Sequence, residues 1–549
     1  MFFKEPAITA PPTPQSGLDT IVAACLLASG LGFLIYIFAT PIENTIYFFS
    51  DDAYYYFNVA RNIVAGNGSS FDGYNLSNGY HPLWMLTILP IYYFTASSPE
   101  LALKLILLLQ TLLTIATFWM CWIFVSRQTT THLGLIALLA LGIFASPWVL
   151  AFNGLESSLV LCISFAILVL DRQHDFLSET APTSTKLLLG VMLGLLVLAR
   201  LDSAFVVIAL SIYMLIFSHR RTNQVKKVFV LCREYLATII AFFIVTAPYF
   251  IWNHTYFGHL SPISGMLKSS FPIPHISLSF NAGALPYLLT FAASIIWAAA
   301  SLLHPNGYLR RILLSEPTVP VKNPLIIVFW LGCLIHVTWT LLFMQWGVYQ
   351  WHFAFYIPAL VLFLVAGAAK ITTLLNNSPA IRLANLSMMS LAILGYSLLV
   401  YADKSSHLEY RYQAALWAKQ HTAPTDTFAL SDAGVFAYFS ERSTINLDGL
   451  INSYEFQEAI KSHTLDGFFA RKNLRYVADA YTKCDYDQRR IAIYAYPAKN
   501  LRQPIGYTIT AQKEDEVFQG TPFLYRPLTE DREICFTIWD YADIDLIPR

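Results

Sequence analysis

Charged residues are scarce in this chain of 549 residues: 13% are charged, whereas 56% are hydrophobic. Because a soluble domain needs a largely polar surface, this composition excludes a single soluble core and predicts a polytopic membrane protein. Neither positive nor negative charge is in excess, since 35 basic residues balance 35 acidic ones. The balance argues against a nucleic-acid partner and against a polybasic tether to lipid.

Three further signals are absent. Residues 1–17 are rich in proline and lack the basic segment of a cleavable signal peptide, so the apolar run at residues 18–39 is expected to remain as the first membrane helix. No internal repeat is evident. No histidine and cysteine spacing typical of a zinc site occurs either, which argues against zinc.

Cysteine is infrequent, with seven residues in the chain. Five lie in or beside apolar runs, where a thiol behaves as a small hydrophobic group; they are Cys25, Cys121, Cys162, Cys232 and Cys333. Only Cys484 and Cys535 lie in the polar C-terminal part. A disulfide between them would suit an oxidising compartment, but two thiols so far apart in sequence leave the pairing open.

Hydropathy predicts about eleven membrane-spanning helices. They lie near residues 18–39, 101–125, 133–151, 158–170, 187–199, 204–217, 235–252, 286–302, 324–343, 353–369 and 384–402. The apolar stretch Leu83–Ala96 is short, is interrupted by Pro90 and is rich in tryptophan and tyrosine, so we expect an interfacial or re-entrant helix there.

The basic residues support this assignment of spans, because it places most of the basic loops on one side. They are Arg127, Arg172, the run HRRTNQVKK at residues 219–227, Arg310, Arg311, Lys322, Lys370 and Arg382. By the positive-inside rule that side is cytoplasmic. The first long loop, the loop around Glu156, the loop WNHTYFGHLSPISGMLKSS and residues 403–549 then share the extracytoplasmic side.

The expected fold is therefore an α-helical polytopic body over residues 1–402, with a first outer loop at about 40–100, and a C-terminal extracytoplasmic domain over 403–549. Short apolar runs alternate with turn signals in that tail, which is typical of a small α+β domain. The predicted location is a membrane, with the first outer loop outside the cytoplasm.

Two adjacent carboxylates, Asp51 and Asp52, follow the first span and open the polar, aromatic segment DDAYYYFNVARNIVAGNGSSFDG. An acid pair at a membrane surface is costly, so it usually serves proton transfer, ion coordination or catalysis, and we favour catalysis. The alternative is that the pair caps the following helix, which suits one aspartate better than both.

Several further segments occur in a fixed order along the chain. They are SNGYHPLW, NGLESS, LARLDS, TYFGHLSP and LSDAGVFAYFSERSTINLDGL. With the acid-pair segment they resemble the GT-C glycosyltransferases, multi-spanning enzymes that transfer a sugar from a polyprenyl-phosphate carrier on the outer face. Within that superfamily the pattern is similar to the branch containing the mycobacterial terminal arabinofuranosyltransferases. The resemblance spans most of the chain.

The resemblance implies a GT-C fold in a bacterial cytoplasmic (inner) membrane and a polyprenyl-phosphate sugar donor, with arabinofuranose as the first candidate sugar. The acceptor would be a glycan, a lipid or a protein. A first-loop aspartate would be the catalytic base in an inverting single displacement. We assign that role to Asp52, with Asp51 as a second base or a metal ligand.

Glu156 would be a second acidic residue that faces the same site; alternatively it caps the helix that follows it. Asp51 and Glu156 offer oxygen ligands that suit a divalent cation such as Mg, Mn or Ca. Many transferases that use lipid monophosphate donors work without a metal, so the expectation is either no cofactor or such a cation.

A departing polyprenyl phosphate needs positive charge or hydrogen-bond donors at its oxygens. The candidates on the outer face are His81, Arg61, Lys268 and Arg200. Three of them have structural alternatives, in which His81 only begins the interfacial helix, Arg61 pairs with Asp52, and Arg200 forms a bridge to Asp202.

Aromatic and imidazole side chains are the candidates for lining the acceptor or the sugar: Tyr55, Trp84, Tyr349 and His352. Outer aromatic residues also anchor proteins at membrane interfaces, which is the commoner role. In the tail, Asp432 and Asp448 fit plain turns. The resemblance implies instead that the tail covers the active site and helps to bind the acceptor.

The rival function is a transporter or flippase of lipid-linked sugars, with Asp51 and Asp52 as coupling sites. Transporters usually place ionisable residues near the middle of the bilayer and contain repeated halves. Here the acids gather at one face and no repeat is seen, so the sequence favours the enzyme.

Overall fold

A computed structural model describes most of the chain. The residues it describes are 16–95, 98–127, 131–145, 153–178, 180–217, 233–276, 280, 282–303, 324–374, 407–482, 484–495, 505–525, 532–542 and 544–548. The predicted span at 384–402, the basic run at 219–227, Arg310, Arg311, Lys322, Arg382 and Cys232 lie outside these residues.

Within these ranges, six helical segments are long and apolar enough to cross a bilayer. Five of them are α1 (Ser16–Ala39), α5 (Pro99–Ser126), α7 (Ser157–His174), α11 (Leu236–Phe257) and α15 (Pro324–Phe343). The sixth joins the 3-10 helix η5 (Gln350–Tyr356) to α16 (Ile357–Leu374). These segments support a multi-pass membrane protein.

Five shorter apolar helices complete the body in the described ranges. They are α4 (Pro82–Phe94), α6 (Thr131–Phe144), α8 (Thr183–Ala199), α9 (Ala204–Phe217) and α13 (Leu285–Leu303). Every predicted span within the described residues coincides at least in part with a helix. Because α6, α8, α9 and the part of α13 at residues 285–300 that counts as apolar fall short of the length criterion, the number of crossings stays a prediction.

Large side chains fill the centre of this helical body. Phe165, Tyr287 and Tyr356 are almost fully buried there, and they come from α7, α13 and η5. The ring of Tyr287 stacks on that of Phe353 with centroids 5.4 Å apart. Close packing of this kind fixes the positions of the helix ends, and therefore of the loops between them.

The C-terminal part is an α/β domain, as predicted. Its helices are α18 (His407–His421), α19 (Gly434–Ser440), α20 (Tyr454–Lys461) and α21 (Leu465–Arg471). Its strands are β1 (Thr427–Leu430), β2 (Ser443–Asn446), β3 (Leu474–Thr482), β4 (Gln488–Tyr494), β5 (Gly506–Gln512), β6 (Glu516–Gln519), β7 (Phe523–Tyr525), β8 (Arg532–Asp540) and β9 (Asp545–Pro548).

The larger sheet has the strand order β2-β1-β3-β8-β6, with β7 also paired to β8. Strand β1 runs parallel to both β2 and β3, whereas β8 is antiparallel to β3. The smaller sheet is antiparallel with the order β4-β5-β9. Helix α19 connects the parallel neighbours β1 and β2, as a parallel connection requires.

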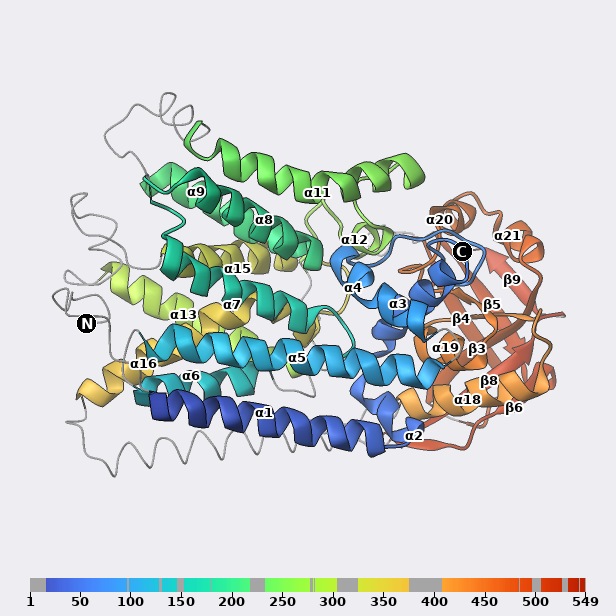
Figure 1. The fold of residues 1–549 in the computed structure, drawn as a ribbon. Helices are drawn as coiled ribbons and strands as arrows, with labels where there is room; N and C mark the ends of the chain where they lie inside the picture. The colour runs from blue at the N-terminus through green and yellow to red at the C-terminus, as the bar shows by residue number, and fades with distance from the viewer. Residues whose placement is uncertain are drawn as a thin grey trace.

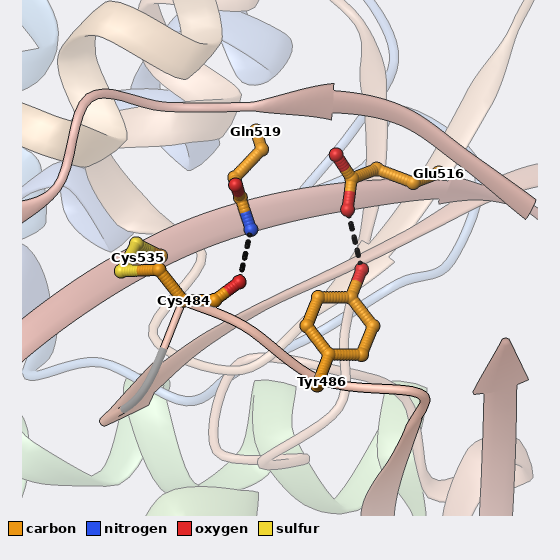
Figure 2. The surroundings of a disulfide bond; sticks show 5 residues. All are labelled: Cys484, Tyr486, Glu516, Gln519 and Cys535. Atoms are coloured by element: carbon orange, nitrogen blue, oxygen red, sulfur yellow. Dashed lines mark hydrogen bonds between the residues drawn. A yellow bond between two sulfur atoms is a disulfide. The ribbon is translucent and has the colours of Figure 1, made fainter. Parts of the chain in front are cut away.

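A disulfide joins Cys484 to Cys535, a pairing that the sequence left open (Figure 2). Cys535 belongs to β8, and Cys484 lies two residues after β3, which pairs with β8, so the bond joins neighbouring strands of the larger sheet where the chain leaves it for β4. Beside it, the Gln519 side chain donates to the Cys484 carbonyl at 2.9 Å. The cysteines Cys25, Cys121, Cys162 and Cys333 are free.

Short elements lie between the helical body and this domain. They are α2 (Ile42–Thr45), η1 (Ile46–Phe48), α3 (Asp51–Val64), η3 (Leu201–Ser203), α12 (Ile263–Lys268) and η4 (Ala282–Ala284), with η7 (Lys513–Asp515) inside the domain. Helices α3 and α12 gather with the C-terminal domain at one end of the helical body (Figure 1, right). The predicted outer loops therefore meet at one end of the molecule.

Candidate active site

Asp51 binds the C-terminal domain. It is the first residue of α3, and its carboxylate accepts hydrogen bonds from the backbone N–H groups of Gly434 (3.0 Å) and Val435 (2.9 Å). These groups open α19, so Asp51 caps that helix, where a negative charge is favourable. The sequence considered a cap for the following helix, but the N-cap of α3 is Ser50.

Arg61 holds the other end of α19. Its guanidinium donates to the carbonyls of Tyr438 (3.0 Å) and Ala437 (3.4 Å) and to Asn58 Oδ1 (2.8 Å). The ion pair with Asp52 that the sequence allowed is not formed. Arg61 binds the C-terminal end of α19, where a cation is stabilising. Its geometry therefore does not favour the predicted contact with phosphate.

Burial raises the pKa of Asp51 to about 8, although Arg411 and the two N–H bonds from α19 oppose the shift and Asp432 adds to it. Both carboxylate oxygens already accept hydrogen bonds. Asp51 is therefore placed as a helix cap rather than as a second base.

Asp52 differs from its neighbour, because no described side chain or backbone group hydrogen bonds to its carboxylate. Burial raises the pKa of Asp52, the charge of Lys268 lowers it, and the charges of Asp432 and Glu156 raise it further. The side chain is half-buried. A carboxylate that accepts no hydrogen bond, has a raised pKa and lies near a cation has the properties of a general base.

Glu156 is held in a network of hydrogen bonds. One of its oxygens accepts a hydrogen bond from Arg200 at 2.5 Å and lies 3.6 Å from His81 Nε2. The other accepts the Tyr56 hydroxyl at 3.0 Å. Glu156 is the N-cap residue of α7, but its side chain makes no capping bond, so the capping alternative is wrong.

His81 is held through its ring and through its backbone. Its Nδ1 accepts the backbone N–H of Leu201 at 3.2 Å, and its own backbone N–H donates to the Tyr56 hydroxyl at 3.0 Å. Because Nδ1 is an acceptor, the neutral ring carries its proton on Nε2. Burial lowers the pKa of His81, while Glu156 raises it.

Arg200 bridges two carboxylates. It binds Glu156, and its Nε lies 2.9 Å from Asp202. Burial raises the pKa of Asp202, but the charge of Arg200 outweighs this and helps to lower the value to about 2. The bridge to Asp202 predicted as an alternative is present, and it fixes the guanidinium beside Glu156 and His81.

Lys268 ends α12, and its backbone carbonyl accepts the N–H of Gln345 at 2.9 Å. No carboxylate of the described residues lies within ion-pair distance of its ammonium group. Burial lowers the pKa of Lys268, the charge of Asp52 raises it and that of Arg200 lowers it. The cation therefore lies near both the candidate base and the Glu156 network without being neutralised by a direct contact.

The four predicted lining residues differ in their burial and in their hydrogen-bond partners. Trp84 is fully buried and its indole N–H donates to the Gly154 carbonyl at 3.0 Å, so its prediction as a lining residue is wrong. His352 is also buried, with Nδ1 against the backbone of Tyr349 at 3.1 Å. Burial raises the pKa of Tyr349, and Asp52 is the first of the charges that add to the shift.

Tyr55 connects the first loop to the end of β2. Its hydroxyl donates to Asp448 at 3.4 Å and accepts the Asn446 amide at 3.2 Å. Sequence reasoning assigned no role to Asn446 or to Tyr56. The run of four consecutive aromatic residues at positions 54–57 of α3 is the signal that could have drawn attention to Tyr56, although buried packing of the helix also accounts for such a run.

The residues do not fit the predicted divalent cation. Both oxygens of Asp51 accept N–H groups of α19, and those of Glu156 are taken by Arg200 and Tyr56. Across the described ranges, no three histidine, cysteine or acidic side chains converge on a point where a metal ion would bind. We therefore derive no chemical step through a metal.

The fold is that of the GT-C glycosyltransferases, as the sequence predicted. The chain is similar to the crystal structure of the Archaeoglobus fulgidus oligosaccharyltransferase tethered with an acceptor peptide, with a TM-score of 0.50 and 13% identity over 85% of this chain and 69% of that chain. It is also similar to the apo form of that protein, at a TM-score of 0.50 and 12% identity over 85% and 70%.

A third similar structure is ArnT from Cupriavidus metallidurans in the apo state, with a TM-score of 0.50 and 11% identity over 93% of this chain and 98% of that chain. A family described as a domain of unknown function (DUF8728) matches residues 401–525. No curated protein matches the chain. At these identities the likeness establishes the fold, and the arabinofuranosyltransferase branch stays a prediction.

Proposed function

We propose that the protein is a membrane glycosyltransferase that moves a sugar from a polyprenyl-phosphate donor to a glycan, lipid or protein acceptor. The observation that carries the proposal is the carboxylate of Asp52, which accepts no hydrogen bond in the described structure and has the ammonium of Lys268 as its strongest favourable charge. A base and a cation placed together suit a reaction that removes a proton and releases an anion.

The proposed reaction is a single displacement at the anomeric carbon. The acceptor oxygen forms a bond to that carbon while the bond to the phosphate oxygen breaks, and the phosphate leaves with the electron pair. The acceptor proton passes to Asp52. One attack from the face opposite the leaving group inverts the anomeric configuration.

Two groups stabilise the departing phosphate in this proposal. Lys268 supplies an unneutralised positive charge, and His81 supplies an Nε2–H whose direction is fixed by the bond at Nδ1. Arg200 acts mainly by holding Glu156, which in turn lies 3.6 Å from His81. Donors that are positioned before the reaction stabilise developing negative charge most effectively.

Arabinofuranose is the first candidate sugar, on sequence resemblance alone. The donor and the acceptor would meet at the outer face of a bacterial cytoplasmic membrane, with the lipid bilayer holding the polyprenyl chain. Residues 1–402 would form the catalytic body and residues 403–549 the outer domain. The oligosaccharyltransferase and ArnT folds support this class of function.

The experiment compares purified wild type, Asp52→Asn and the control Asp426→Asn. Asp426 accepts the Ala423 N–H at 2.8 Å before β1, away from α3, so the control makes the same chemical change elsewhere. Each protein is incubated with radiolabelled polyprenyl-phosphate sugars and membrane acceptors. We expect transfer by the wild type and the control, and a loss of about 10²- to 10⁴-fold in Asp52→Asn.

Full transfer by Asp52→Asn would refute the assigned base. Movement of a labelled lipid across vesicles without any covalent product would instead support the transporter.

A further inference from the structure

Two acidic residues lie at the carboxyl ends of neighbouring parallel strands in the C-terminal domain. Asp432 follows β1 and Asp448 follows β2. Because the strands are parallel, these ends lie at the same edge of the sheet, which is where open α/β sheets usually bind ligands. The proposed mechanism uses neither residue.

Asp448 is bonded through one oxygen only. Its Oδ2 accepts the backbone N–H of Asp432 at 2.8 Å, the Asn446 amide at 3.2 Å and the Tyr55 hydroxyl at 3.4 Å. Its Oδ1 accepts no hydrogen bond from any described residue. Asp432 is held in turn by Arg411, whose Nη2 donates to it at 3.0 Å. These bonds fix one oxygen of Asp448 and leave the other for a ligand.

Asn446 is a second and independent sign of a ligand. Its side chain is 1% exposed, yet its Oδ1 has no hydrogen-bond partner among the described residues. Its Nδ2 binds Tyr55 and Asp448, so the amide lies within the same cluster. Buried polar atoms in proteins are nearly always satisfied, and an orphan carbonyl therefore points to a donor that is supplied from outside.

This cluster lies beside the candidate base. Tyr55, whose hydroxyl binds Asp448 and Asn446, lies three residues after Asp52 on α3, so the two side chains are neighbours on that helix. The loop that carries Asp448 packs on α12, because Leu450 forms a buried apolar cluster with Ile263 and Leu267. Leu267 immediately precedes Lys268, so this loop and the candidate cation share one support.

We propose that Asn446, Asp448 and Tyr55 form the subsite that binds the acceptor, and that the acceptor is a neutral hydroxylated sugar. The inference rests on the proposed glycosyltransferase function. The two unsatisfied oxygens, Asn446 Oδ1 and Asp448 Oδ1, are hydrogen-bond acceptors, so they match O–H donors on adjacent carbons of a sugar. They would repel a phosphate or a carboxylate, which disfavours an anionic acceptor.

The subsite explains how the C-terminal domain takes part in the reaction. With two hydroxyls bound at Asn446 and Asp448, the sugar would lie beside Tyr55, which is a helical neighbour of Asp52 on α3. The three residues do not touch the bond that breaks, so they are binding residues. Their loss is expected to act on the acceptor rather than on the donor.

The test measures the KM of the acceptor and of the donor separately, with the full chain in detergent. The acceptor probes are methyl glycosides of arabinofuranose, mannose, galactose and glucose, together with their monodeoxy analogues. We expect the acceptor KM to rise about tenfold or more in Asn446→Leu and in Asp448→Asn, since each removes one hydrogen bond, while the donor KM stays near that of wild type. Asp426→Asn is again the matched control.

The outcomes separate this inference from the proposed function. If the wild type transfers no sugar from any donor, the proposed function fails and the inference fails with it. If the wild type transfers sugar but both variants keep its acceptor KM, the inference alone is overturned. A wild-type preference for an anionic or peptide acceptor would overturn it too.

Thermal unfolding of the variants shows whether they fold. Should both unfold, saturation-transfer NMR of the wild type with the same glycosides decides. Weaker binding of a deoxy analogue would support the subsite, and equal binding of all analogues would overturn it.

Discussion

Asp51 and Asp52 are adjacent in sequence, yet their carboxylates have different surroundings. Both oxygens of Asp51 accept N–H groups at the start of α19, whereas Asp52 accepts no hydrogen bond within the described structure. Sequence reasoning recognised the pair as unusual. It did not divide the roles, because the division depends on a helix that lies far along the chain.

The first prediction separates the two residues by stability. Asp51→Asn replaces one of the two acceptor oxygens at the α19 N-terminus by an NH2 group, which cannot accept a hydrogen bond there, so unfolding should become easier by about 1–3 kcal/mol. Asp52→Asn should leave the unfolding temperature near that of wild type, since its carboxylate makes no hydrogen bond there. Differential scanning fluorimetry of the detergent-solubilised proteins measures both. A wild-type unfolding temperature in Asp51→Asn would contradict the capping role.

The second prediction concerns pH. The pKa of Asp52 is raised by burial, and the proposed base must be deprotonated to act, so kcat/KM should fall as pH decreases through that raised pKa. Lys268 lowers the same pKa. Lys268→Met should therefore move the acidic limb of the pH–rate profile to higher pH, in addition to slowing transfer.

The control for this experiment is Lys104→Met, because Lys104 pairs with Glu100 at 2.9 Å on α5 rather than with Asp52. An acidic limb that stays in place in Lys268→Met, or that moves to lower pH, would show that Lys268 does not act on the base.

At the scale of elements, the docking of α19 on α3 requires a glycine. A Cβ atom at Gly434 would meet the backbone carbonyl of Asp51, and backbone atoms cannot move aside as a flexible side chain can. Gly79 makes a similarly close approach to the carbonyl of Leu450. Both contacts join the first loop to the C-terminal domain.

The third prediction follows from this contact. Gly434→Ala should lower the free energy of unfolding by about 1–3 kcal/mol through overpacking, and should expose the junction to limited proteolysis. Gly520→Ala is the matched control, because an added Cβ there meets only ordinary contacts at 3.5 Å or more. Equal proteolysis of the two variants would mean that the junction tolerates the extra atom.

The sequence predicted the helices well and their contacts poorly. Long apolar runs such as α1 and α5 are recognisable because a bilayer demands about twenty apolar residues, whatever the tertiary structure. Arg61 was expected near Asp52 from helix spacing, but its guanidinium binds carbonyls of α19 instead. Such partners come from the packing of distant segments, which no local pattern encodes.

The candidate site residues also show that local sequence patterns do not predict contacts between distant segments. Glu156, Arg200 and His81 were chosen separately from three motifs, and the structure brings them together in one network. Trp84 was chosen as an aromatic residue of the outer face, yet it is buried. The type of a residue indicates the chemistry it can do, whereas only the fold decides whether its polar atoms are left accessible.

At the scale of the whole molecule, the disulfide makes the C-terminal domain sensitive to reduction. Cys484 and Cys535 are separated by 51 residues and join the end of β3 to β8 in the larger sheet. Removing a bond that closes a loop of this size usually costs about 2–4 kcal/mol. The fourth prediction is that Cys535→Ser, or treatment with a reductant, lowers the unfolding temperature of the domain.

Cys25→Ser is the control for this prediction, since Cys25 is an exposed free thiol of α1. Intrinsic tryptophan fluorescence follows the domain through Trp539, which is buried in β8. An unfolding temperature that is insensitive to reductant would show that the bond contributes no stability.

The contact between Asp51 and α19 also has a consequence for biosynthesis. The two partners are separated by 383 residues, so the first loop leaves the ribosome long before the helix it caps. At ordinary rates of translation the interval is roughly 20–80 s. During that time Asp51 lacks the N–H groups of α19, and the proposed acceptor subsite, which needs Asn446 and Asp448, forms later still. A chain released before residue 434 would therefore lack the contact between Asp51 and α19 as well as the proposed subsite.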